Sequence, residues 1–168
     1  MSHSKLCWVA CTGALVILTA CGGGSDSAST SNTSGNTNVA DPVDKYEGTW
    51  SACLTVKSGG SDQNTITATK TSAATINFSG QDIYYTSADC TGTPADTVPS
   101  SAQATHVGTK QIGTDTVDKW NVQAPLTTFK TVTLVANGQI TFGLNASDGG
   151  AVDAEGFPTT WDMTLNKK

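Results

Sequence analysis

From about residue 44 to the C-terminus, the chain is built of short stretches in which apolar and polar residues alternate. The first stretch, 46–56, places Tyr46, Trp50, Ala52, Leu54 and Val56 on one face of an extended strand. Further β-rich stretches span 65–71, 74–78, 83–86, 105–112, 116–122, 129–136, 139–144 and 159–165. No helical periodicity extends beyond two turns. The pattern therefore predicts an all-β domain of eight or nine strands.

Turn residues between these stretches predict hairpins. Asn137-Gly138 is the clearest, because both residues tolerate the positive φ angles of a type I′ turn. Gly113-Thr114-Asp115 and residues 79–82 predict two more, and polar loops are expected over 90–101 and 147–155. Consecutive hairpins form one antiparallel meander, which closes into a barrel of about eight strands or, alternatively, forms a β-sandwich.

The N-terminus has the pattern of an export signal. Met1–Lys5 is followed by thirteen largely apolar residues, 6–18, too few to cross a bilayer. Leu18-Thr19-Ala20-Cys21 resembles the lipobox of bacterial lipoproteins. The resemblance implies a signal peptide over 1–20, cleavage before Cys21 and acylation of that cysteine, although a signal peptide with an incidental cysteine has the same outline. Gly22 in place of Asp favours the outer membrane in a two-membrane cell.

Residues 21–43 are almost entirely small or polar and contain few large apolar side chains. Such a segment cannot bury enough surface to offset its conformational entropy, so we expect a disordered linker with the folded domain over 44–168.

Of the five cysteines, Cys7 and Cys11 lie in the predicted signal and Cys21 is the predicted lipid attachment site. Cys53 and Cys90 remain, and an isolated pair in an exported domain favours one structural disulfide. A metal site would need more His or Cys than His106 supplies, and a redox pair normally has closer spacing.

Gly48-Thr49-Trp50, at the start of the first strand, resembles the Gly-x-Trp signature of lipocalins and related calycin barrels. The resemblance implies an eight-stranded up-and-down barrel whose Trp50 fills the closed end and whose open end binds small apolar molecules. Lipocalins usually place an arginine over this tryptophan. This chain contains no arginine, and only Lys167 or Lys168 follows the last strand.

Composition excludes several functions. The chain has a net charge of −5, 28 Thr, 16 Ser and no Arg, so it lacks the cationic clusters that bind nucleic acid. No catalytic motif or cofactor loop is found, which indicates a protein that is not an enzyme and has no cofactor. Asn145, Asp148, Asp153 and Glu155 could supply oxygen ligands to Ca²⁺, but their spacing does not match a calcium loop, and a polar loop is the ordinary explanation.

These features predict a non-enzymatic lipoprotein held on the membrane of the cell envelope by its N-terminal lipid. Its partner would be a small apolar ligand in the barrel. In the alternative, the barrel is filled and the protein binds another envelope protein as a scaffold, an adhesin or an inhibitor of a periplasmic enzyme. Tyr84, Tyr85, Trp120, Phe142 and Trp161 are candidate core residues that could also contact a ligand in a hollow barrel.

Overall fold

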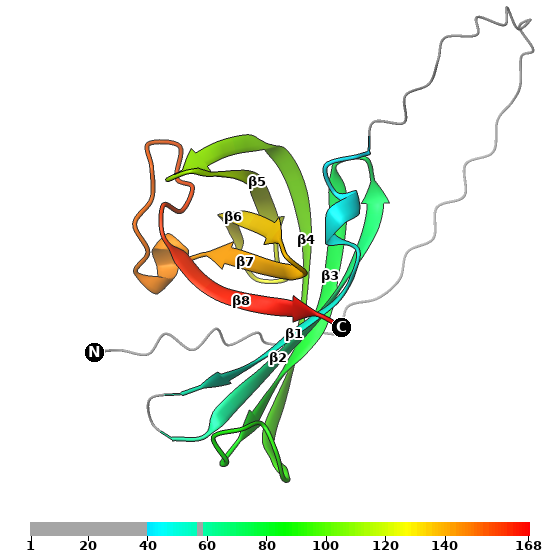
Figure 1. Ribbon diagram of the computed structural model, residues 1–168, viewed down its shortest axis with the longest axis vertical. Helices are drawn as coiled ribbons and strands as arrows, with labels where there is room; N and C mark the ends of the chain where they lie inside the picture. Colours follow the sequence, from blue (N-terminus) through cyan, green and yellow to red (C-terminus); the bar gives the residue numbers. More distant parts are fainter. Residues whose placement is uncertain (1–39, 57–58) are drawn as a thin grey trace, which may run out of the picture.

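The computed structural model describes residues 40–56 and 59–168, so the predicted signal peptide, Cys21 and most of the predicted linker lie outside the described residues. Eight antiparallel strands form one closed barrel in the order of the sequence (Figure 1). This is the up-and-down barrel that the alternating pattern predicts, and the sandwich is excluded. Within the described part, no helix is long and apolar enough to span a bilayer.

The strands are β1 (Gly48–Thr55), β2 (Ser61–Ser72), β3 (Thr75–Tyr85), β4 (Pro94–Ile112), β5 (Asp115–Gln123), β6 (Thr128–Ala136), β7 (Gln139–Gly143) and β8 (Trp161–Lys167). Two short 3-10 helices accompany them, η1 (Asp44–Tyr46) before β1 and η2 (Ala146–Asp148) between β7 and β8. Alternate side chains along each strand point into the barrel, which places the main core inside it.

Two of the predicted local structures are wrong. Residues 79–82 do not form a turn but continue β3, paired with β2 on one side and β4 on the other. Gly80 is needed there because a Cβ would lie 2.0 Å from the backbone oxygen of Thr65. The predicted loop over 90–101 is also largely strand, since β4 begins at Pro94. Asn137-Gly138 forms its predicted hairpin, with φ angles of 52° and 73°.

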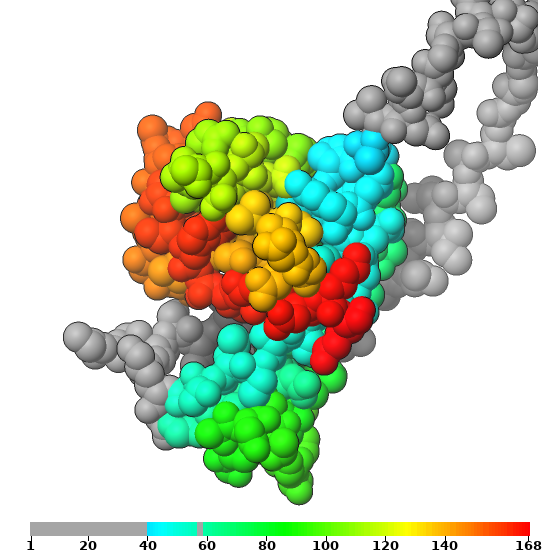
Figure 2. Space-filling model, in the orientation of Figure 1, coloured from blue at the N-terminus to red at the C-terminus, as the bar shows by residue number. Residues whose placement is uncertain are grey.

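The end of the barrel where β1 begins is closed by η1. Val43, Tyr46 and Trp50 are fully buried there, and the indole Nε1 of Trp50 donates a hydrogen bond to the backbone oxygen of Tyr46 at 2.8 Å. In the space-filling view, atoms of η1 (cyan), of the segment around the β6–β7 turn and of β8 (red) cover this side of the barrel (Figure 2).

Trp50 is also covered by a cation. Lys167, at the end of β8, places its Nζ 5.2 Å from the centre of the Trp50 ring. Gly48 leaves room for this side chain, because a Cβ at Gly48 would lie 3.1 Å from Lys167 Cε and its φ is +125°. Only two residue pairs, Trp50–Lys167 and Ser51–Asn166, join β1 to β8. The contact therefore lies where the barrel closes.

A buried polar network joins η1 to the barrel wall. The Tyr46 hydroxyl donates to Asp118 and lies 2.7 Å from Thr133 Oγ1, which also accepts a 2.7 Å hydrogen bond from Trp120 Nε1. His106 Nε2 and Lys45 Nζ lie 3.1 and 2.6 Å from the two carboxylate oxygens of Asp118. Burial and the charge of Asp118 raise the pKa of Tyr46 far above its usual range. Tyr46 therefore stays protonated as a donor.

At the opposite end, the outer parts of β1 to β4 extend beyond the barrel as an arm (Figures 1 and 2). Cys53 in β1 forms a disulfide with Cys90 in the β3–β4 connection, which confirms the predicted pair. The crosslink holds the outer end of β1 to this connection, across β2 and β3. Closing a loop of this length stabilises a fold by roughly 3–4 kcal/mol in the chain-entropy account.

We expect Lys167→Ala to lower the free energy of unfolding by about 0.5–1 kcal/mol, because it removes the cation above Trp50 at a partly exposed site. Lys167→Arg should retain the stability of the parent. Lys168→Ala is the matched control and should change little. Urea unfolding monitored by circular dichroism measures all three, and equal losses for Lys167→Ala and Lys168→Ala would refute a specific role for the contact.

Candidate functional site

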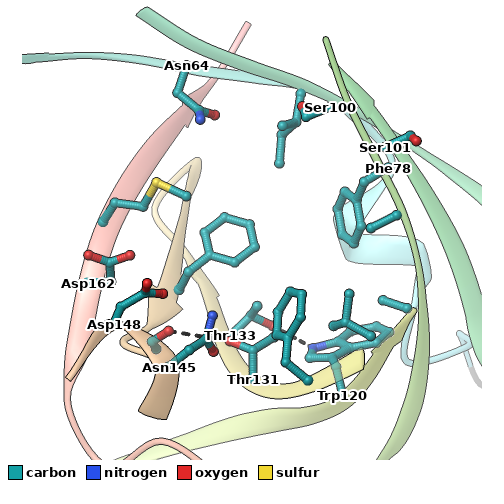
Figure 3. A pocket seen from close by; sticks show the side chains of 18 of the residues that line it. Asn64, Phe78, Ser100, Ser101, Trp120, Thr131, Thr133, Asn145, Asp148 and Asp162 are labelled. Carbon is teal, nitrogen blue, oxygen red and sulfur yellow. Dashed lines mark hydrogen bonds between the residues drawn. The ribbon is translucent and has the colours of Figure 1, made fainter. Parts of the chain in front are cut away.

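The barrel is hollow. A cavity of about 200 Å³ lies between the closed end and the arm, and its lining comes from every strand except β1 (Figure 3). The inner wall is mainly apolar, with hydroxyl groups from Thr131 and Thr133. Its apolar residues are Ile66, Phe78, Ala102, Ala104, Trp120, Val122, Phe129, Phe142 and Met163. An engineered apolar cavity of about 150 Å³ stays dry and binds benzene, so this volume suits one ring with a short chain.

The cavity is present because β4 carries small side chains at its inward positions. The inward positions Ser100, Ala102 and Ala104 carry one or two side-chain heavy atoms each, where other strands of the barrel place aromatic rings. Gly80 on β3, opposite Ser100, adds no side chain at all. Because interiors are otherwise closely packed, a row of small residues along one strand leaves an opening in the core.

The rim of the cavity is acidic. Asp82 on β3, Asp148 in η2 and Asp162 on β8 line it, together with the amides Asn64 and Asn145. Figure 3 shows Asp148 and Asp162 next to each other on one side of the open space, with Asn64 and Ser100 at its top and Trp120 at its bottom. These residues lie near the strand ends that are farthest from η1. The mouth of the cavity is therefore at the opposite end of the barrel from η1, which we call the plug because it closes its end of the barrel.

The surroundings of the rim carboxyl groups Asp82 and Asp162 disfavour their charged form. Burial and the negative charge of Asp62 raise the pKa of Asp82 to about 6, against a hydrogen bond from Asn64 Nδ2 that lowers it. Partial burial and the charge of Asp148 raise the pKa of Asp162. Carboxyl groups in a cleft whose pKa values are raised by burial are candidates for a functional site.

The structure separates the four residues considered for Ca²⁺. Asn145 and Asp148 belong to the cavity rim, whereas Asp153 and Glu155 pair with Lys110 and Lys119 on the outer wall. Asp153 also accepts the backbone N–H groups of Glu155 and Phe157, which shapes the β7–β8 loop. The described residues contain no group of three metal-binding side chains.

The candidate aromatic residues divide among three places. Trp120 and Phe142 line the cavity, Trp161 packs in a second cluster with Phe157 outside the barrel, and Tyr84 and Tyr85 lie on the arm, outside the core. His106 is half-buried and faces Asp118 at the closed end. Sequence reasoning missed Asp82 and Ser100, because both fell in segments assigned to turns or loops. Apolar and polar residues also alternate through 98–106, and this pattern could have predicted that Ser100 lies in a strand.

No protein-family model, curated protein or solved structure matches the chain. The cavity and the chemistry of its lining are therefore the observations from which a function can be argued.

We expect Asp82→Asn to stabilise the protein near neutral pH. The pKa of Asp82 is about 6 in the folded state and about 3.9 in an unfolded chain, so the folded state holds this proton more tightly. The stabilising effect of the proton is complete below pH 4 and is lost as the pH rises through 6. At pH 7.5 the variant should gain about 1–2 kcal/mol after allowance for solvent screening.

At pH 3.5 the gain from Asp82→Asn should vanish, because Asp82 is then protonated in both states. Denaturant unfolding at the two pH values measures the effect. Asp115→Asn, which changes an exposed carboxyl group at the start of β5, is the control and should change stability little at either pH. A gain at pH 3.5 equal to that at pH 7.5 would contradict the assigned pKa shift.

Proposed function

We propose that this protein is a lipid-anchored, non-enzymatic binding protein of the bacterial cell envelope that carries a small, mainly apolar ligand inside its barrel. The observation that carries the proposal is the cavity of about 200 Å³ with an apolar wall and a polar mouth. Concave, apolar pockets with a few polar groups at one end are typical of small-molecule sites. The eight-stranded meander with Trp50 at its closed end is consistent with a lipocalin-like barrel.

The geometry also favours rigid binding. The floor of the cavity includes Trp120, whose Nε1 is held by Thr133, and Thr133 is in turn held by Tyr46. A wall fixed in this way does not have to be ordered when a ligand enters, so little conformational entropy is lost on binding.

The test is titration of the purified full-length protein with toluene, propylbenzene and pentylbenzene, monitored by calorimetry and by tryptophan fluorescence. Affinity should rise about fourfold with each added methylene, until the cavity is full. Ala102→Leu should abolish binding by filling the cavity, whereas Ala136→Leu, at an exposed position of β6, should leave it unchanged. If neither these probes nor amines bind, the carrier function is wrong, and the alternative of a protein-binding lipoprotein becomes the better account.

The membrane anchor rests on the sequence Leu18-Thr19-Ala20-Cys21. Each buried methylene of an acyl chain contributes about 0.8 kcal/mol, and two or more chains give stable anchoring. With Gly22 after the cysteine, we place the anchored protein in the outer membrane of a two-membrane cell.

We expect Cys21→Ala to move the protein from the membrane fraction to the soluble fraction of a bacterial host, because no acyl chain can then be attached. Fractionation followed by immunoblotting measures the distribution. Cys11→Ala, within the predicted signal, is the matched control and should remain in the membrane fraction. Retention of the Cys21→Ala protein in the membrane would refute the lipid anchor.

A further inference from the structure

The described cations and anions are not evenly paired. Lys70 binds Asp41 and Asp44, Lys45 binds Asp118, and Lys110 and Lys119 bind Asp153 and Glu155. Lys130 donates to the backbone oxygen of Glu155, and Lys167 lies over Trp50. All these contacts hold the plug, the barrel closure or the outer loop, and no described lysine or histidine lines the cavity.

Several of the described acids that form no ion pair lie at or next to the cavity mouth, while others, such as Asp115, are exposed elsewhere. Asp82, Asp148 and Asp162 line the mouth, Asp62 is close enough to Asp82 to raise its pKa, and none of the four forms an ion pair with a described residue. Repulsion acts within two pairs, Asp62 with Asp82 and Asp148 with Asp162, and partial burial adds to it at Asp62, Asp82 and Asp162, so these charges disfavour the folded state. Groups that lower the stability of the fold are often found at binding sites, where they contribute to function.

The neutral polar atoms of the mouth also require donors. Asn64 Oδ1 and Asn145 Oδ1 line the cavity, are buried and, among the described residues, accept no hydrogen bond. Asn64 uses its Nδ2 to donate to Asp82, which fixes its oxygen as the unpaired atom. Two buried acceptors without donors destabilise the fold, because a buried polar atom without a partner loses its hydration and gains nothing. A ligand group with several N–H donors would satisfy them.

We propose that the ligand of this cavity is a small amine whose apolar body lies against the inner wall. Its ammonium group is attracted to the mouth by the negative charges of Asp82, Asp148 and Asp162 and donates hydrogen bonds to the adjacent amide oxygens. This proposal rests on the proposed carrier function and specifies its ligand class. The ammonium has a positive charge for the unpaired carboxylates and three donors for the orphaned acceptors. Carboxylate ligands such as fatty acids meet repulsion at the same place.

The experiment compares three probes with similar apolar bodies, 2-phenylethylamine, propylbenzene and 3-phenylpropionate, by calorimetry on the full-length protein at pH 7.5. The amine should bind at least about tenfold more tightly than propylbenzene, which is the effect of one charge-assisted hydrogen bond. The carboxylate should bind most weakly. Added salt should weaken amine binding and leave propylbenzene binding unchanged.

Variants of the rim residues test whether their negative charge, rather than a general change in the cavity, determines the affinity for the amine. Asp82→Asn and Asp162→Asn should each lower amine affinity about three- to tenfold and leave propylbenzene affinity unchanged, whereas Asp115→Asn should affect neither. If propylbenzene binds as tightly as the amine, or if the rim variants leave amine affinity intact, the amine proposal is overturned while the carrier function stands. If no probe binds, the carrier function itself has failed.

Discussion

The buried carboxylate of Asp118 is the constraint on which the rest of the structure depends. A charge in this position is tolerated only because Tyr46, Lys45 and His106 all reach it, and two of these three come from η1. The same network fixes Thr133 and, through it, the indole of Trp120. A single buried charge thus holds the plug in the barrel and sets the floor of the cavity above it.

The β7–β8 loop is held on the outside of the barrel by contacts of its own. The β7–β8 loop has no regular strand to hold it, apart from the bridge between Val152 and Pro158. Phe157 holds it against β5 and β6, since the centre of its ring lies 4.9 and 5.0 Å from the amino groups of Lys119 and Lys130. Since the same loop contains Asp148, this external contact also positions one side of the cavity mouth. The strands alone would not do so.

Alternation along the chain predicted most of the strands, and the residue types at Asn137-Gly138 predicted that hairpin. The disulfide followed from the two cysteines left outside the predicted signal and lipid site, and the burial of Trp50 from the Gly-x-Trp resemblance. Sequence prediction failed where local composition and tertiary pairing disagreed. Ser79-Gly80-Gln81-Asp82 has the composition of a turn, yet Gly80 lies mid-strand because the neighbouring backbone comes too close for a side chain. The cavity was equally hidden, because whether Ala102 faces a void or a neighbour depends on what the opposite strands place there.

The two ends of the barrel have different roles. Residue 40 and the plug are at one end, and the cavity mouth, the arm and the disulfide are at the other. The described chain therefore begins at the closed end, away from the mouth. In the lipid-anchored protein that we propose, the tether would join the barrel at one end and the ligand would enter at the other, so that anchoring and binding would not compete for the same surface.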